Sequence, residues 1–178
     1  MKATGIVRRI DDLGRVVIPK EIRRTMRIRE GDPLEIYTSA EGEVIFKKYS
    51  AIGELSENAT QVAEIMRQLA GCPVVVFDRD HVVATSGVTK REFQERRVSP
   101  ELEELMESRR QYYAGDGVRE LHPVEGVNAS TLAAMPIPSA GDVTGAVAFL
   151  AGGKNQTATE LQKSLVSAAA QFLGRQVE

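Results

Sequence analysis

Residues 8–24 read RRIDDLGRVVIPKEIRR, and this stretch decides the fold of the first part of the chain. The β-branched residues of 4–10 predict a strand. Residues 11–14 predict a tight turn, in which Gly14 takes a positive φ. Residues 15–18 are again β-branched and predict a second strand.

The following residues alternate turns with regular elements. Pro19 ends the second strand because it lacks an N–H, and its fixed φ favours a helix over residues 20–26. Gly, Asp and Pro at 31–33 predict another turn. Strands are then predicted over 34–38, where apolar and polar residues alternate, and over 43–48. The first 50 residues therefore predict a β-β-α-β-β unit that is mainly β.

This unit is small for an independent domain. With about 50 residues it can hardly bury enough apolar surface to offset its chain entropy. The chain has one cysteine, so neither an internal disulfide nor a multi-cysteine metal site can reinforce the unit. We therefore predict that residues 1–50 fold as a dimer.

Charge is divided unequally along the chain. Residues 1–29 hold nine Lys and Arg against three Asp and Glu, whereas residues 51–178 hold twelve against seventeen. The net charge of the whole chain, −2, hides this division. A basic segment joined to an acidic body indicates that the segment alone meets a polyanion such as double-stranded DNA.

The predicted helix carries a row of basic residues. Spacings of i, i+3, i+4 and i+7 place them on one face, opposite Ile22 and Met26, which are expected to face the core. The row consists of Lys20, Arg23, Arg24 and Arg27. A basic row alone is more often a solvated face than a DNA-binding surface.

Three further arginines change that balance. Arg8, Arg9 and Arg15 flank the predicted turn without a comparable set of carboxylates, and phosphate is the partner that best offsets their repulsion. Arg also suits bidentate contact with phosphate or with guanine edges. Asp11 and Asp12 are expected to orient the turn or the arginines and to have no catalytic role.

Beyond residue 50 the pattern becomes α+β. Residues 52–70 predict a helix with a short heptad pattern at Leu55, Ala59, Val62, Met66 and Leu69. Two interpretations stay open: a coiled-coil seam, or an amphipathic helix that packs on its own domain. Strands are predicted over 74–77, 82–85, 111–114, 117–122, 130–137 and 143–150, with a helix over 101–110 that Ser99 caps. A capping box over 157–160 opens the last helix, which carries a stripe of Leu161, Leu165, Ala168 and Phe172.

The first 50 residues resemble the N-terminal domain of AbrB-type transition-state regulators. The resemblance runs over 2–25 and continues through 31–37 to 47–49, and Leu-Gly-Arg-Val-Val-Ile-Pro at 13–19 is its most specific part. It implies a swapped-hairpin dimer that binds DNA through Arg8, Arg15, Arg23 and Arg24, with Arg9 in a position that is basic in relatives. Lys20 and Arg27 receive no role from the family, and Arg27 replaces a helix-ending glycine.

The chain as a whole resembles the stage V sporulation protein T family. The motifs over 135–147 and 168–176 are similar to the end of that family's GAF domain. The resemblance implies a swapped-hairpin DNA-binding domain over 1–50, a linking helix over 51–71 and an α+β GAF-like domain over 72–178. It also implies a regulator of forespore genes, acting as activator or repressor, and a homotetramer whose GAF-like domains pair through their terminal helices.

Other functions are weighed against this one. Antitoxins of toxin–antitoxin pairs use the same kind of DNA-binding head, but usually with a short flexible tail in place of a second domain. An enzyme is not expected: Cys72 has no resolving partner, and His81 and His122 lie far apart in the sequence. No cofactor and no metal ligand are predicted. The GAF-like domain either senses an unidentified small molecule, with binding residues unknown, or serves only as a dimerisation scaffold.

The sequence also indicates where in the cell the protein is expected. No apolar run reaches the length of about 20 residues that crosses a bilayer, and no membrane partner is predicted. We expect a cytoplasmic protein that is associated with the nucleoid of the forespore.

Overall fold

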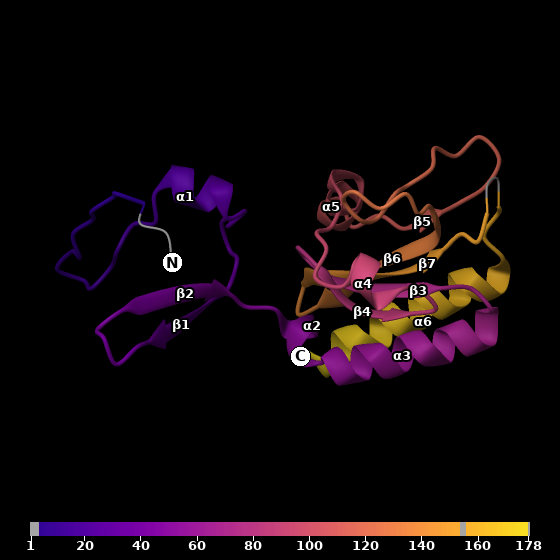
Figure 1. The fold of residues 1–178 in the computed structure, drawn as a ribbon, viewed down its shortest axis with the longest axis horizontal. Helices are drawn as coiled ribbons and strands as arrows, with labels where there is room; N and C mark the ends of the chain where they lie inside the picture. Colours follow the sequence, from indigo (N-terminus) through magenta and orange to yellow (C-terminus); the bar gives the residue numbers. More distant parts are fainter. Residues whose placement is uncertain (1–3, 154–155, 178) are drawn as a thin grey trace. The chain divides into compact units, whose positions relative to one another are not determined.

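The computed structural model of the chain describes residues 4–153 and 156–177 (Figure 1). It divides into two compact units, Met1–Tyr49 and Ser50–Glu178. Both units combine helices with antiparallel strands.

The first unit contains one short helix and one hairpin. Helix α1 (Lys20–Thr25) precedes strands β1 (Leu34–Thr38) and β2 (Val44–Lys48), which pair in antiparallel fashion. Pro19 stands immediately before α1, where its missing N–H costs no hydrogen bond. Gly42 takes a φ of 83° in the turn between the strands. The predicted helix and the last two predicted strands of this unit are confirmed.

The two strands predicted over 4–10 and 15–18 are not formed in the single chain. The chain reverses at the predicted turn, where Asp11 N donates to Arg15 O and Gly14 N donates to Asp11 O, both at 3.0 Å. Residues 4–18 otherwise contain no assigned strand. A strand needs a hydrogen-bonded neighbour along its length, and these residues meet none among residues 4–153 and 156–177 beyond the turn.

Helix α1 ends one residue earlier than predicted. Arg27 has a φ of 51°, in the left-handed region in which many helices end, and Ile28 N then donates to Arg23 O at 2.8 Å. Arg27 is therefore not part of the helical row of basic residues. Met26, which was expected in the core, is exposed in the single chain.

The second unit is built on a five-stranded antiparallel sheet of strand order β4-β3-β7-β6-β5. Its strands are β3 (Val74–Asp78), β4 (Val82–Ser86), β5 (Tyr112–Tyr113), β6 (Thr131–Ser139) and β7 (Asp142–Leu150). Ala140 and Gly141 both have positive φ and form the two-residue turn of the predicted β6–β7 hairpin. Residues 74–77 are buried without alternation because both faces of the sheet are covered.

One face of the sheet is covered by three helices, α2 (Ala51–Glu54), α3 (Ser56–Ala70) and α6 (Glu160–Gln176). Figure 1 shows α3 and α6 side by side on this face. The single helix predicted over 52–70 is thus interrupted, because Leu55 leaves the helical conformation with φ −93° and ψ 26°.

The heptad pattern of α3 is explained by its own domain. Ala59, Ala63 and Met66 are buried against the sheet, whereas Leu69 is exposed. Of the two interpretations left open by the sequence, the amphipathic helix that packs on its own domain is the one observed.

The opposite face is covered by α4 (Lys90–Phe93), α5 (Pro100–Glu107) and the long segment that joins β5 to β6. Ser99 caps α5 as predicted, since its Oγ accepts from Leu102 N at 3.1 Å. The strand predicted over 117–122 is wrong. That segment is irregular and buries Leu121 against the sheet, while Leu121 O accepts from Thr131 N at 2.9 Å.

The last helix begins later than predicted. Its capping box is formed by Thr159 and Gln162, not by residues 157 and 160: Gln162 N donates to Thr159 Oγ1 at 3.2 Å, and Thr159 N donates to Gln162 Oε1 at 2.9 Å. Val166, Ala170 and Leu173 face the sheet. The predicted apolar stripe is only partly used: Leu165 packs against the core, whereas Leu161 and Phe172 are about half exposed.

Candidate nucleic-acid interface

The five arginines predicted to bind DNA are all exposed. Arg8 and Arg9 lie in the extended segment before the first turn, and Arg15 follows that turn directly. Arg23 and Arg24 occupy neighbouring positions on α1. An arginine side chain must be exposed to solvent before it can contact a DNA duplex.

The first turn is held by one carboxylate. Asp11 Oδ1 accepts from Leu13 N at 3.0 Å and from Arg15 N at 2.8 Å, and Asp11 Oδ2 accepts from Arg15 Nε at 2.8 Å. These bonds to the backbone and side chain of Arg15 lower the pKa of Asp11. The predicted structural role of Asp11 is confirmed: it orients both the turn and the guanidinium group.

The end of α1 is fixed by two residues that sequence reasoning missed. Lys48 Nζ donates to the carbonyl of Arg27 at 2.9 Å and lies 3.6 Å from Asp32 Oδ2. Asp32 Oδ2 also accepts from Arg29 N at 2.8 Å, and the Asp32 side chain is only 3% exposed. This lysine–aspartate clasp ties the residues after α1 to the end of β2. The sequence gives little signal of this contact, because the carboxylate lies in a Gly-Asp-Pro turn and the lysine lies much later, at the end of a strand.

Charge in this region is largely uncompensated. In the described part of the chain, no carboxylate forms an ion pair with Arg8, Arg9, Arg23 or Arg24. Arg15 has its ion pair with Asp11, yet its side chain remains 70% exposed. Four free guanidinium groups and one oriented guanidinium group can donate bidentate hydrogen bonds to phosphate oxygens or to guanine edges.

The first unit also exposes a large share of its apolar residues. Among the described residues 4–49 only Pro19 is buried, and Val7 and Val17 are 86% and 71% exposed. The other large exposed apolar side chains of this unit are Ile6, Ile10, Leu13, Val16, Met26, Ile36, Tyr37, Val44, Phe46 and Tyr49. A monomer rarely exposes apolar surface on this scale, which is typical of a surface that pairs with another chain.

The single cysteine of the second unit, Cys72, is half-buried. Burial raises the pKa of Cys72, although Gln162 Nε2 donates a hydrogen bond to its Sγ at 3.4 Å. Among the residues that the structure describes, no group of three or more His, Cys, Asp and Glu side chains is placed to hold a metal ion. None of the described helices is long and apolar enough to cross a membrane.

Known proteins resemble the whole chain and its first part. Stage V sporulation protein T of Bacillus subtilis is 47% identical over 180 residues, which cover 100% of this chain and 99% of that protein. Transition state regulatory protein AbrB of the same organism is 51% identical over 69 residues, 35% of this chain and 71% of that protein. The family described as "Antidote-toxin recognition MazE, bacterial antitoxin" matches residues 7–52.

The second unit has the GAF fold. The GAF domain from a phosphoenolpyruvate-protein phosphotransferase of Coxiella burnetii superposes with a TM-score of 0.56 at 14% identity, over 69% of this chain and 82% of that one. The predicted fold class, an AbrB-like head followed by an α+β GAF-like domain, is therefore confirmed. The family described as "Stage V sporulation protein T C-terminal, transcription factor" matches residues 54–178. Together with the full-length relative, this match shows that the chain belongs to the stage V sporulation protein T family.

Proposed function

We propose that this protein is a transcriptional regulator of sporulation genes that binds double-stranded DNA through its first unit. The observation that carries the proposal is the set of exposed arginines in that unit, of which four have no carboxylate partner within the described chain. The likeness to a sporulation protein over the full chain, and to a transition state regulator over the head, supports the same function.

Each arginine has a proposed role that follows from its position. Arg23 and Arg24 on α1 reach the duplex from a rigid element, and the Lys48–Asp32 clasp keeps the end of that element in place. Arg15 is oriented by Asp11 and acts with Arg8 and Arg9 around the turn. A set of this kind neutralises phosphates, so its affinity for DNA should fall steeply as salt is added.

The head acts as a dimer in this proposal. Its apolar residues are exposed in the single chain, and residues 4–18 have no backbone partners among the described residues beyond the turn. A second copy would cover the exposed apolar residues and supply hydrogen-bonded strand neighbours to residues 4–18, as in the interlaced hairpins that the AbrB resemblance implies. Dimerisation also doubles the number of arginines that meet one duplex.

The second unit extends the assembly to a homotetramer. Apolar side chains on the outer sides of α3 and α6 are exposed, among them Ile65, Leu69, Leu161 and Phe172. Two such faces from different dimers would bury one another. Sedimentation of the full-length protein as a dimer with an intact head would contradict this part of the proposal.

The test of DNA binding uses five single substitutions, of Arg8, Arg9, Arg15, Arg23 and Arg24 to Ala. Each arginine that contacts DNA should cost about 1–3 kcal/mol of binding free energy at fixed salt, measured by fluorescence anisotropy. The DNA is a duplex recovered by genome-wide footprinting in sporulating cells. Arg91→Ala, at an exposed position of α4, is the matched control and should bind as the unchanged protein does. Unchanged affinity in all five head variants would discard the assignment.

An antitoxin function is the second candidate, because the family that matches residues 7–52 is described as an antitoxin. It has less support than a transcription factor, since the match ends where the second unit begins and another family accounts for residues 54–178. A growth assay would separate the two functions. It would compare cells that express the chain with and without a neighbouring gene, which an antitoxin function would make the toxin gene. An antitoxin is needed only when its toxin is present.

The proposal assigns no catalytic step to either unit and no cofactor. It places the protein with the forespore nucleoid, where its DNA would be. Fluorescence microscopy of a tagged full-length chain during sporulation tests that location, and a signal spread evenly through the mother cell would contradict it.

A further inference from the structure

One peptide bond of the second unit joins the two residue types that most favour rearrangement of the backbone. Asp116 is followed by Gly117, and no other aspartate or asparagine in the chain precedes a glycine. The γ-carbon of an aspartate and the nitrogen of the next residue can join in a five-membered ring. A side chain on that next residue hinders the ring closure, and glycine has none. Ring closure is therefore least hindered at Asp116.

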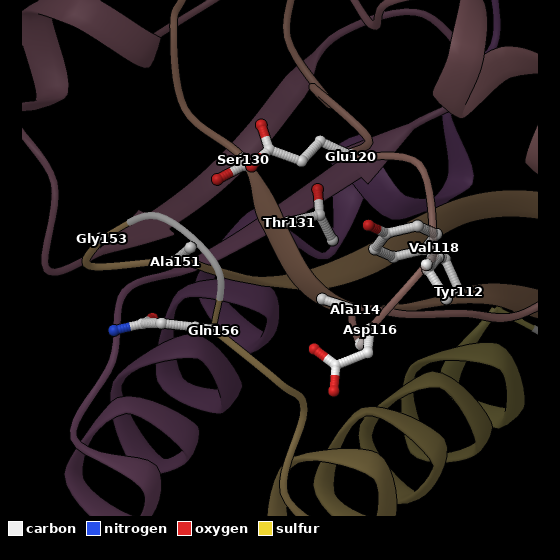
Figure 2. Close-up of a pocket in the computed structure, with 12 residues that line it drawn as sticks. Tyr112, Ala114, Asp116, Val118, Glu120, Ser130, Thr131, Ala151, Gly153 and Gln156 are labelled. Atoms are coloured by element: carbon white, nitrogen blue, oxygen red, sulfur yellow. The ribbon is translucent and has the colours of Figure 1, made fainter.

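This bond lies at the centre of a tight turn in the loop that follows β5. Val118 N donates to Gly115 O at 3.1 Å, which closes a four-residue turn. Gly117 takes a φ of 75°, and the space around its α-carbon is open. Asp116 and Gly117 are both exposed, and Figure 2 shows the Asp116 carboxylate pointing away from Glu120. The turn thus leaves the side chain and the backbone of this bond open to solvent.

Both reacting groups are free of hydrogen bonds to the part of the chain that the structure describes. The Asp116 carboxylate forms neither a hydrogen bond nor an ion pair there, and the Gly117 amide donates to no acceptor. A group that is held in a hydrogen bond within the protein must give up that bond before it can react, and this costs free energy. Neither group at this turn has such a bond to lose.

The other aspartates differ at one or both of these groups. Asp12 is the best comparison, because its carboxylate also has no partner among the described residues. However, the nitrogen that would attack it, Leu13 N, donates to Asp11 Oδ1 at 3.0 Å, and Leu13 carries a branched side chain. The aspartates at 11, 32, 78, 80 and 142 likewise precede residues that have side chains. Among the aspartates, all of which lie in the described ranges, Asp116 alone combines a free carboxylate, a free amide and an unhindered nitrogen.

We propose that Asp116 is a site of isoaspartate formation, a modification that needs no enzyme. The Gly117 nitrogen attacks the Asp116 γ-carbon and forms an N–Cγ bond. The carboxyl group, protonated by solvent, loses its OH as water together with the amide proton, which leaves a cyclic succinimide. Water then reopens the ring. Cleavage of the N–Cγ bond restores aspartate, whereas cleavage between the nitrogen and the α-carbonyl carbon yields isoaspartate, whose mass is unchanged.

The product adds one carbon to the backbone of a loop whose two ends are held. Before the turn, Ala114 N donates to Leu132 O at 2.8 Å, and after it Thr131 N donates to Leu121 O at 2.9 Å. Leu121 is also buried against the sheet. The change is therefore confined to the turn, and the second unit stays folded. Because the reaction involves only this loop, it is independent of the proposed DNA-binding function.

The experiment incubates the full-length protein at about 37 °C and neutral pH for several weeks and digests samples with trypsin. Chromatography with mass spectrometry separates the isoaspartyl form of peptide 111–119, which has the same mass and a different retention time. A protein isoaspartyl methyltransferase, which transfers a labelled methyl group from S-adenosylmethionine to isoaspartate, gives a second readout. We expect isoaspartate to accumulate at Asp116 at least tenfold faster than at Asp12 in peptide 10–15 of the same sample.

A free peptide tests the contribution of the folded turn. A synthetic peptide with the sequence of residues 111–119 has no tertiary structure to protect its Asp-Gly bond. If the turn leaves the reacting groups open, the rate in the folded protein should lie within tenfold of the rate in the peptide. A rate in the protein more than a hundredfold lower would show that the turn protects the bond, and this would overturn the inference.

Three variants test the assignment to one residue. Asp116→Glu keeps the charge but would need a six-membered ring, so it should lower isoaspartate formation in peptide 111–119 at least tenfold. Asp116→Asn loses ammonia in place of water on ring closure and gains about one mass unit on hydrolysis. It should convert at least tenfold faster than the matched variant Asp12→Asn. Both Asp116 variants lie at an exposed loop position, and their circular dichroism should equal that of the unchanged protein.

The possible outcomes are distinct. Isoaspartate that forms equally fast at Asp12 and Asp116, that is absent from peptide 111–119, or that persists in Asp116→Glu would each contradict the inference. If an Asp116 variant does not fold, the comparison of the two peptides of the unchanged protein decides the matter alone. None of these measurements contains DNA, so failure of the head to bind DNA would leave their result intact.

Discussion

The two units of this protein use apolar residues in opposite ways. In the second unit, residues such as Phe77, Val147 and Phe149 lie in a sheet that helices cover on both faces, and they are fully buried. In the first unit, similar residues such as Val7 and Val17 remain in contact with water. A chain segment of about 50 residues has too much surface for its volume to close a core alone. The difference teaches that the GAF unit has a core of its own, whereas the apolar residues of the basic head lack one in the single chain.

The largest effect is expected from a charge placed in the head. If Val7 and Val17 become buried when two heads pair, Val7→Asp or Val17→Asp would bury a carboxylate without a partner, which costs several kcal/mol. The head should then fail to form its dimer and should lose its affinity for DNA. Analytical ultracentrifugation and anisotropy measure the two losses.

The control for that test comes from the other unit. Val118→Asp introduces the same charge at an exposed loop position and should change the free energy of unfolding by less than about 0.5 kcal/mol. Head variants that behave like Val118→Asp would show that the head surface stays exposed, and the contrast between the units would disappear.

The second largest effect is expected where α6 meets the sheet. A β-carbon at Gly174 would collide with the carbonyl of Pro138, so Gly174→Ala must push the helix away from β6. We expect it to lower the free energy of unfolding of the second unit by about 1–3 kcal/mol, despite the better helix propensity of Ala. Chemical denaturation followed by circular dichroism measures this change. Ser164→Ala on the exposed side of α6 should be neutral, and equal stability of both variants would refute the close packing.

A smaller effect of opposite sign is expected in the head. Arg27 has a left-handed backbone, which costs roughly 1–2 kcal/mol for a residue with a β-carbon. Arg27→Gly should therefore stabilise the head by about 0.5–1 kcal/mol with little change in DNA affinity. Thr25→Gly, in the regular last turn of α1, should destabilise it by a similar amount. Loss of stability in Arg27→Gly would mean that the contacts of the Arg27 side chain outweigh the strain of its left-handed backbone.

The smallest effect is expected from a fall in pH. Hydrogen bonds from Arg15 hold the pKa of Asp11 below its ordinary value of 3.8. The contribution of this carboxylate to the turn is therefore complete above that value and is lost as the pH falls through the lower pKa of the folded state. Because both side chains are exposed, the change should be local. An NMR titration of the Arg15 amide should follow it, and Asp11→Asn should remove the titration. An Arg15 amide that still titrates in that variant would contradict the assignment.

Much of this organisation could be predicted from sequence because it depends on short-range chemistry. Gly14, the Asp11 carboxylate and Pro19 specify a turn and a helix start by their own conformational limits. The apolar run of β3 reflects a strand whose two faces are both covered. The concentration of arginines in the head needed only the sequence, and so did the AbrB resemblance that selected Arg8, Arg15, Arg23 and Arg24.

The errors arose where long-range contacts decide. The strands predicted over residues 4–18 need backbone neighbours that a single chain does not supply. Residues 117–122 resemble a strand locally but are drawn over the sheet by the burial of Leu121. The capping box moved to Thr159 because Gln162 serves as well as a glutamate at the third helical position.

The sequence by itself determined that a basic, arginine-rich head is joined to an acidic α+β domain, since composition, turn residues and periodicity are local properties. Only the tertiary structure decided which of those residues act together. It brought Lys48 and Asp32 to the end of α1, and it placed Val166, Ala170 and Leu173 of α6 against the sheet while Leu161 and Phe172 stayed exposed. These relations join residues that are far apart in the chain, and packing in three dimensions is what fixes them.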